Sequence, residues 1–300
     1  MRILLTGSKG FVGQALKNHL ESLDYVVIDY DLPDDITDSV NFRMKLNQNN
    51  IDMVIHAAAI ADLYETAKDL DKNFRVNVYG THIVGRVCAD EHVPLIFIST
   101  CCVYGNAREQ DGEDFETENH TIPATIEPYA CSKMAGEYIL RGIQGLDYVV
   151  LRIGTVFGEN MRESLFNYIA LNKVLNGDTI TVYGDGTQTR NYIYIDDLVR
   201  GISAAVEFFY FANGKTINIC GNDETSVIET IKTAETLTGK TATVVYSDKR
   251  YGEIYRERIS NQKARLLLKW QPEYNYFDAM RKTFGNDARF NKSIKFAYYD

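Results

Sequence analysis

Cysteine and histidine are scarce in this chain, with five of each in 300 residues. The cysteines are odd in number and follow neither a disulfide framework nor the spacing of a zinc site. They are Cys88, Cys101, Cys102, Cys131 and Cys220. We therefore expect free thiols in a reducing compartment, the cytoplasm, and no metal site.

Positive charge and long apolar runs are also lacking. The formal net charge of -9 at pH 7 argues against a nucleic-acid partner, because such a partner calls for a basic face. The longest apolar stretch, residues 202–212, is interrupted by Glu207 and is too short to span a bilayer. A strand expected from Arg2 onward leaves no room for a signal peptide. We predict a protein without a membrane partner.

With only five prolines and no low-complexity linker, the chain shows no clean domain boundary. Short apolar strands alternate with helical stretches, a pattern typical of a parallel sheet covered on both faces. The expected strands are residues 2–6, 25–29, 52–58, 93–99, 148–153 and 191–195. We predict a doubly wound α/β fold of the Rossmann type. Its nucleotide-binding domain would comprise residues 1–154 and 186–205, and a smaller interleaved C-terminal lobe would comprise residues 155–185 and 206–300.

A glycine-rich turn joins the first expected strand to the helix that follows. Gly7 permits a tight turn, Gly10 lets the backbone approach a pyrophosphate, and Gly13 lets the helix pack on the strand. The helix N-terminus, with Phe11 and Val12, supplies free N–H groups to an anion. Glycine turns also join strands to helices for purely structural reasons, so this turn alone leaves cofactor binding open.

A carboxylate follows at the end of the second expected strand. Asp29 lies about 20 residues after the first glycine, where such a group bonds the adenine ribose hydroxyls. No arginine follows it to receive a 2′-phosphate, which favours NAD over NADP. Asp31 competes for the same role, and an ordinary solvated turn over residues 29–35 is the alternative for both.

Tyr129 and Lys133 lie four residues apart, so on a helix they are neighbours on one face. An ammonium close to a phenol lowers the pKa of the phenol, and the pair then works as a general acid/base near neutral pH. The same spacing arises by chance in many helices, so the pair needs support from the rest of the chain.

Several motifs, taken in order, resemble the extended short-chain dehydrogenase/reductase family over nearly the whole chain. The similarity is to its branch of nucleotide-sugar epimerases and dehydratases, such as UDP-glucose 4-epimerases. The motifs are the glycine turn and residues 35–36, 56–59, 76–81, 98–105, 128–133, 182–192, 250–253 and 269–272. The resemblance adds to the NAD site Asp35 and Ile36 at the adenine, Ala57, Ala58 and Ala59 beside the cofactor, and Asn77, which braces the sheet.

The resemblance also implies a mechanism that begins with hydride transfer from a sugar carbon, usually C4, to tightly held NAD. Tyr129 would remove the hydroxyl proton as its phenolate. Lys133 would stabilise that phenolate and hold the nicotinamide ribose. Thr100 would bond the reacting hydroxyl and relay its proton, at a position where many relatives carry serine.

The substrate that the resemblance implies is a nucleoside-diphosphate sugar, with a UDP-sugar favoured. Arg190 and Arg250 are candidates for its diphosphate, since guanidinium groups suit phosphate oxygens. Tyr183 and Tyr192 are candidates for the sugar or nucleobase pocket, with aromatic packing as the alternative. Thr155 stands where relatives usually carry asparagine, and we expect it to bond a diphosphate or sugar hydroxyl.

The chain departs from the family directly after Thr100. Dehydratases of this branch continue with an aspartate and a glutamate, and similar decarboxylases use the glutamate, whereas this chain has Cys101 and Cys102. We therefore discount both activities. Cys102 matches a cysteine with which relatives epimerise C3 or C5 of a 4-keto sugar. The histidine or lysine that assists it there is missing from residues 159–163, and a small buried thiol is the alternative interpretation.

Together these residues favour an NAD-dependent nucleotide-sugar 4-epimerase, which oxidises C4 and returns the hydride to the opposite face of the 4-keto sugar. The alternatives are a 4-keto-sugar reductase, a 3- or 5-epimerase using Cys102, a non-sugar alcohol dehydrogenase, and a protein that only binds dinucleotide. Residues 80–91 and 132–142 resemble the helix pair through which this family often dimerises. We therefore expect a homodimer.

Overall fold

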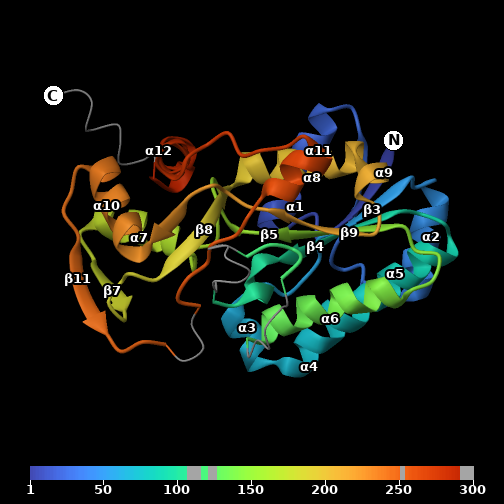
Figure 1. Ribbon diagram of the computed structural model, residues 1–300, viewed down its shortest axis with the longest axis horizontal. Coiled ribbons are helices and arrows are strands. Elements are labelled where there is room, and N and C mark those ends of the chain that lie inside the picture. The colour runs from blue at the N-terminus through green and yellow to red at the C-terminus, as the bar shows by residue number, and fades with distance from the viewer. Residues whose placement is uncertain (107–115, 121–126, 251–253, 291–300) are drawn as a thin grey trace.

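The computed structural model describes residues 1–106, 116–120, 127–250 and 254–290 of the chain. A large sheet with its covering helices forms one lobe, and two small sheets with their helices form the other (Figure 1). The strands are β1 (Arg2–Thr6), β2 (Val26–Tyr30), β3 (Met53–His56), β4 (Leu95–Thr100), β5 (Tyr148–Ile153), β6 (Thr155–Phe157), β7 (Thr179–Tyr183), β8 (Thr189–Tyr194), β9 (Lys215–Ile219), β10 (Glu224–Ser226) and β11 (Thr243–Ser247).

The α-helices of the described residues are α1 (Phe11–Ser22), α2 (Ser39–Gln48), α3 (Leu63–Lys68), α4 (Leu70–Asn73), α5 (Thr81–Asp90), α6 (Pro128–Gly142), α7 (Phe166–Asn176), α8 (Ile195–Glu207), α9 (Phe209–Ala212), α10 (Val227–Thr238), α11 (Gln262–Leu268) and α12 (Tyr276–Asn286). A π-helical segment, Phe74–Gly80, leads into α5, and a 3₁₀ turn, Cys101–Tyr104, follows β4.

Six strands form the large sheet in the order β2-β1-β3-β4-β5-β9, and every neighbouring pair is parallel. Parallel neighbours need crossover connections, and helices supply them on both faces. Helices α1 and α8 pack together over one face, whereas α2, α5 and α6 cover the other (Figure 1). The predicted doubly wound fold is confirmed.

The core explains why the strands are short apolar runs rather than alternating ones. In β1, Ile3 and Leu5 pack with Leu16 of α1 on one face, and Leu4 packs with Val84 of α5 on the other. Both faces of the strand are therefore buried, as in parallel sheets generally.

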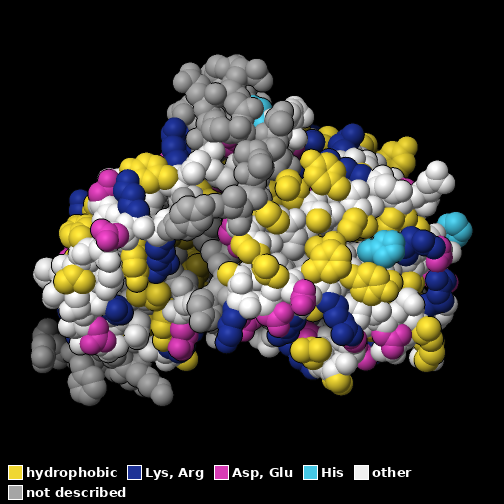
Figure 2. Space-filling model, turned by 90° about the horizontal axis from the view of Figure 1, so that it is seen from below, with side chains coloured by type: hydrophobic (Ala, Val, Ile, Leu, Met, Phe, Trp, Pro, Cys, Tyr) yellow, Lys and Arg dark blue, Asp and Glu magenta, His cyan; other side chains and the backbone are white. Residues whose placement is uncertain are grey.

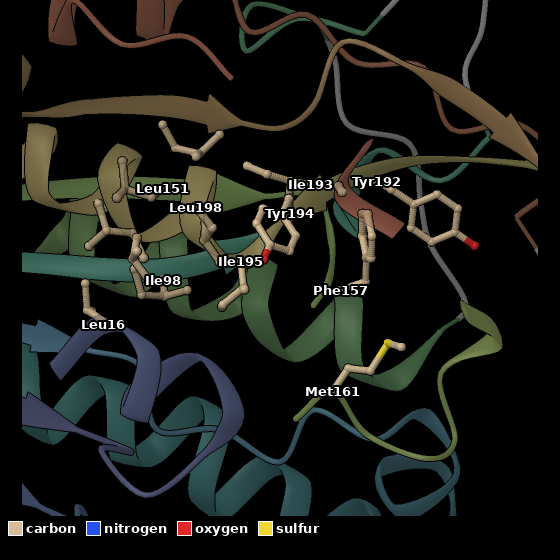
Figure 3. Close-up of a cluster of buried hydrophobic side chains, with 14 of the residues drawn as sticks. Leu16, Ile98, Leu151, Phe157, Met161, Tyr192, Ile193, Tyr194, Ile195 and Leu198 are labelled. Carbon is tan, nitrogen blue, oxygen red and sulfur yellow. The ribbon is translucent and has the colours of Figure 1, made fainter. Parts of the chain in front are cut away.

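The core on the α1 side continues into the second lobe. Figure 3 shows Leu16, Ile98 and Leu198, from the large sheet and its helices, in the same cluster as Phe157 and Tyr192. The last two rings meet edge to face, with centroids 5.8 Å apart. The two lobes thus share one hydrophobic core.

Two parts of the predicted lobe division differ from the structure. The strand expected at residues 191–195 is β8, which pairs with β6 and β10 in a three-stranded sheet and not with the large sheet. Conversely, β9 falls in the range 206–300 predicted for the second lobe, yet it pairs with β5 as the sixth strand of the large sheet. The sequence of a short apolar strand does not show which strand it pairs with. The rest of the predicted lobe division stays a prediction.

A buried ion pair locks α6 against β4 and β5. Arg152 of β5 donates to both carboxylate oxygens of Glu137 of α6, from Nε at 3.0 Å and from Nη2 at 2.8 Å. Ser99 of β4 donates to the same carboxylate at 2.6 Å, and Arg152 Nη1 donates to the Tyr104 hydroxyl at 2.8 Å. Because its hydrogen bonds are well satisfied, this buried pair holds three elements in one geometry.

All five cysteines are free thiols, as expected. Over the described ranges, no group of three or more histidine, cysteine, aspartate or glutamate side chains has a geometry suited to a metal ion. In the same part of the chain, no helix combines the length and the apolar character needed to cross a membrane.

Candidate active site

Several of the predicted site residues lie at the carboxyl ends of four neighbouring strands of the large sheet. Gly7 follows β1, Ala57 follows β3, Thr100 ends β4, and Thr155 comes two residues after the end of β5. In doubly wound sheets, ligands bind at this edge. The fold therefore gathers residues that are far apart in the sequence.

Packing within the protein accounts for two glycines of the turn but not for the third. Gly7 has φ +73°, and a Cβ on it would lie 2.7 Å from the Ala58 nitrogen, while a Cβ on Gly13 would lie 2.0 Å from the Gly7 oxygen. Packing alone thus requires these two glycines. A Cβ on the exposed Gly10 would meet its nearest protein atom at 3.3 Å.

Gly10 is also the N-cap of α1, and no described side chain caps this end of the helix. The absence of a side chain at Gly10 therefore leaves the first N–H groups of the helix open to a ligand. An anionic group such as a pyrophosphate suits this position. Phe11 and Val12 form the first turn and are half-buried against the core.

Of the two candidate acids, Asp31 bonds the backbone of the glycine turn, whereas Asp29 is acted on by the side chains of Ser8 and Lys9 of the turn. Strand β2 ends at Tyr30, one residue later than predicted, and Asp29 inside it forms an ion pair with Lys17 of α1. Asp31 follows the strand, and its carboxylate accepts a hydrogen bond from the Lys9 backbone at 2.8 Å. Asp31 is thus the acid whose carboxylate bonds the backbone of the turn.

The pair predicted to contact adenine lies before α2. The Asp35 carboxylate accepts two hydrogen bonds from Thr37, both 2.8 Å long, which lower the pKa of Asp35. Ile36 is buried, and its Cδ1 lies 2.6 Å from where a Cβ on Gly80 would be. In this structure only the carboxylate of the pair is exposed.

Asn77 ties the loop after β3 to α6 from within the π-helical segment. Its Oδ1 accepts from the Ile60 backbone at 2.8 Å, and its Nδ2 lies 3.0 Å from both the Ile60 oxygen and Ser132 Oγ. Ala57, Ala58 and Ala59 begin this same loop. Asn77 therefore fixes the segment beside the glycine turn, which is the bracing expected of it.

The start of α6 is set by Glu127, which precedes Pro128 at the first helical position. The Glu127 carboxylate accepts hydrogen bonds from the backbones of Tyr129 and Ala130, at 2.9 and 2.7 Å. Proline suits the first turn because its missing N–H would have no partner there. The cap thus starts the helix before Tyr129, so that Tyr129 and Lys133 both lie in it, one turn apart.

Thr100 lies close enough to Tyr129 for its side chain to lower the pKa of the phenol. The pKa of Tyr129 is raised, mainly by burial and then by the neighbouring Cys102, while Arg162 and Thr100 act in the opposite direction. The predicted lowering of this pKa by Lys133 is therefore not what the structure shows. Burial outweighs the nearby charges, and the phenol holds its proton at neutral pH.

Lys133 is 1% exposed, and its ammonium lies 4.1 Å from the centre of the Phe97 ring. Burial lowers the pKa of Lys133 to about 7, against the attraction of Glu137 one turn further along α6. The lysine is thus poised between its charged and neutral forms, and it is not a permanent cation.

Cys102 lies beside Thr100, whose Oγ1 accepts a hydrogen bond from the Cys102 backbone at 3.1 Å. Burial, followed by the charge of Glu257, raises the pKa of the Cys102 thiol to about 12. A thiol with such a pKa holds its proton at neutral pH, so the structure favours the packing interpretation of Cys102.

The predicted substrate residues fall into two groups. Arg250 stacks on Tyr183, with its guanidinium carbon 3.8 Å from the ring centre. Arg190 donates to the carbonyls of Thr189 and Ile254 at 2.8 and 2.6 Å. Tyr192, in contrast, is buried between aromatic rings, and for it the structure favours the packing alternative. Residues 251–253 of the Arg250 motif lie outside the described residues.

Two charged residues near the site were not assigned a role from the sequence. Arg162 is an exposed cation close enough to Tyr129 to lower the pKa of that phenol. Glu257 is buried beside Thr155 and Arg190. A charged residue in a polar segment looks the same whether it is solvated or turned inward, so the sequence carried no signal for Glu257.

Comparison with known proteins agrees with this fold. The model of the NAD dependent epimerase/dehydratase family matches residues 3–220. A putative UDP-glucose 4-epimerase of Methanocaldococcus jannaschii is 27% identical over 93% of this chain and 96% of its own length. Decarboxylases and dehydratases of nucleotide sugars are also relatives, at 26–28% identity.

Two solved structures are similar in both fold and sequence. The UDP-glucuronic acid 4-epimerase from Bacillus cereus, in complex with UDP-glucuronic acid and NAD, has a TM-score of 0.84 at 27% identity, over 98% of this chain and 100% of that chain. The UDP-glucose 4-epimerase of Thermus thermophilus, in complex with NAD, has a TM-score of 0.83 at 25% identity, over 94% and 97%.

The pKa of Lys133 makes the stability of the protein depend on pH. Between pH 7 and 10.5 the unfolded chain carries a proton on this lysine that the folded chain lacks. The free energy of unfolding therefore rises with pH in this window, and the cost of the buried ammonium is largest below pH 7. We expect Lys133→Met to be more stable than the parent at pH 6, on the order of a few kcal/mol.

Urea denaturation at pH 6, 8 and 10 measures this effect, with the exposed Lys232→Met as the control. The curve of Lys133→Met should be flatter than that of the parent between pH 7 and 10, and Lys232→Met should follow the parent. Parallel curves for all three proteins would contradict the expectation.

Proposed function

Because this chain belongs to the NAD dependent epimerase/dehydratase family, we propose that it is a nucleotide-sugar 4-epimerase acting on a UDP-hexose. The observation that carries the proposal is the proximity of Tyr129 to Thr100, with Lys133 one turn further along α6. This group can move the proton of one sugar hydroxyl. Cys101 and Cys102 follow Thr100 in the turn after β4, where the acids of a dehydratase are expected.

When bound, NAD supplies a hydride acceptor and a positive charge. The open N-terminus of α1 at Gly10 would hold its pyrophosphate, and Asp31 would bond the adenine ribose. Asp35 would face the adenine side, and the segment from Ala57 to Ala59 would line the opposite side. These assignments follow from the exposed donors and acceptors at the carboxyl edge of the sheet.

In the proposed mechanism, Tyr129 exchanges a proton with the C4 hydroxyl, and Thr100, which lies beside Tyr129, would align that hydroxyl by a hydrogen bond to it. Because Tyr129 is a phenol, it can take the C4 proton only by passing its own proton on; the neutral amine of Lys133 would accept that proton, and the resulting ammonium would return it when the 4-keto oxygen is reprotonated. The raised pKa of Tyr129 favours the phenol, the form that reprotonates the 4-keto oxygen when the hydride returns. The epimerisation consumes no external oxidant.

A UDP-uronate is the second candidate substrate, and Arg162 is the observation in its favour. Its guanidinium is exposed, near Tyr129, and 4.0 Å from the carboxylate of Asp62. A cation beside the reacting sugar suits a carboxylate on that sugar. The Bacillus cereus relative, whose structure holds UDP-glucuronic acid, shares 27% of its residues with this chain.

Incubation of the NAD-loaded protein with UDP-glucose or UDP-glucuronate tests the function directly. Proton NMR should show the corresponding 4-epimer of at least one substrate. We expect Tyr129→Phe to lower kcat by about 10²–10⁴-fold, since it removes the proton donor. Tyr138→Phe, an exposed tyrosine on the same helix, is the control. Failure to convert either sugar would reject the proposal, and deuterium entering C3 or C5 from heavy water would favour the 3- or 5-epimerase.

The two aspartates near the glycine turn give a separate test of the cofactor site. We expect Asp31→Ala to weaken NAD binding by about tenfold or more, because it removes the carboxylate that lies at the turn. Asp29→Ala should change it by less than about threefold, since Asp29 is paired with Lys17. Titration calorimetry of cofactor-free protein with NAD measures both. A larger loss for Asp29→Ala would support the assignment made from the sequence.

We also propose that the protein forms a homodimer through α5 and α6. Figure 2 shows hydrophobic and histidine side chains gathered on the side of the molecule that carries these helices. Tyr79 and Tyr138 are exposed there, and the Tyr79 ring lies 6.2 Å from that of His82. A large exposed apolar patch is typical of an interface between proteins.

Sedimentation velocity tests the dimer. A charge placed in a buried interface is costly, so we expect Tyr138→Glu to convert the dimer to a monomer. Tyr210→Glu changes an exposed tyrosine on α9 and should leave the dimer intact. A parent protein that sediments as a monomer at micromolar concentration would refute the proposal.

A further inference from the structure

Glu257 is a buried carboxylate that none of the roles above uses. Its side chain is 3% exposed, and its Oε1 has no hydrogen-bond partner among the described residues. Its Oε2 accepts a hydrogen bond from Thr155 Oγ1 at 3.3 Å and lies 4.0 Å from Arg190 Nε. A buried carboxylate with an unpaired oxygen costs stability, so a role in the site is a reason to retain it.

Glu257 lies among the residues predicted to bind the substrate. Thr155 begins β6, just after β5 at the carboxyl edge of the large sheet, and Arg190 lies in β8, the strand that pairs with β6. The Glu257 charge also acts on Cys102, two residues after the catalytic Thr100. Glu257 therefore lies behind Thr100 and Thr155, the residues at the ends of β4 and β5 that would face a ligand.

The contact between Glu257 and Thr155 determines whether the Thr155 hydroxyl donates or accepts a hydrogen bond toward a ligand. A threonine hydroxyl has one proton to donate and two lone pairs to accept with. Thr155 gives its proton to Glu257, so its oxygen acts toward any other partner as an acceptor. Thr155 is half-buried whereas Glu257 is enclosed, so Thr155 is the member of the pair within reach of a ligand.

We propose that Glu257 is a positioning residue that sets the sugar preference, by holding the Thr155 proton so that the Thr155 oxygen accepts from a sugar hydroxyl. The inference rests on the proposed function, because it requires a nucleotide sugar whose hexose reaches Thr155. A hydroxymethyl group at C6 can donate to this oxygen. A uronate carboxylate has only acceptors and brings a second negative charge toward Glu257. The pair thus selects UDP-glucose over UDP-glucuronate, against the attraction of Arg162.

The test compares kcat/KM for UDP-glucose and UDP-glucuronate in the NAD-loaded full-length protein. Glu257→Leu frees the Thr155 proton to donate to a carboxylate. We expect it to raise the ratio of the uronate to the hexose value by about tenfold or more. Glu257→Met is a second apolar variant of similar size. A ratio of two substrates measured on one variant does not depend on the folded fraction, so partial unfolding does not mimic the effect.

A double-mutant cycle with Thr155→Val shows whether Glu257 acts through Thr155. In the Thr155→Val background, Glu257→Leu should change the ratio by less than about threefold. Glu224→Gln is the matched control, since Glu224 pairs with Arg256, the neighbour of Glu257 in the sequence. It should leave the ratio unchanged.

Each outcome bears on one claim. An unchanged ratio in both Glu257→Leu and Glu257→Met overturns the inference while leaving the epimerase intact. An equal effect of Glu257→Leu with and without Thr155 overturns the role of the held proton. If the wild type neither binds nor converts either substrate, the proposed function itself fails.

Discussion

The buried pair of Glu137 and Arg152 is the contact on which the site depends. It joins α6, which carries Tyr129 and Lys133, to β5, and through Ser99 it reaches the strand that ends in Thr100. Loss of one partner would leave a charge buried without its counter-ion, at a cost of about 3–5 kcal/mol. The same carboxylate lies one turn from Lys133 and opposes the fall of its pKa. One interaction therefore fixes the position of the acid/base pair and moderates the fall of the Lys133 pKa.

Local signals in the sequence predicted the parts of the site that local physics determines. The glycine turn needs Gly7 and Gly13 for packing, and a cap with proline after it begins α6 just before Tyr129. The assignment of Asp29 depended on where a strand ends, and a shift of one residue moved it from the end of β2 into its interior. Strand ends are set by pairing with neighbours, which a single strand does not encode.

The remaining differences concern contacts between segments that are distant in sequence. Glu257 lies between two arginines, a pattern typical of a solvated surface. Arg256 and Arg258 do pair with Glu224 near the surface, but side chains of an extended segment alternate in direction, so the residue between them turns inward. The same limit explains β8 and β9, whose partners follow from the shared core and not from their own residues.

Burial drives both members of the acid/base pair toward their uncharged forms, because it raises the pKa of Tyr129 and lowers that of Lys133. The sequence argument treated Lys133 as a fixed positive charge that activates the phenol. A lysine with a pKa of about 7 instead changes its charge with its surroundings. A positive group near Tyr129 favours the phenolate, and a negative one near Lys133 favours the ammonium. The protonation of the pair is therefore coupled to what binds, so the protein positions these groups and leaves their charge to its ligands.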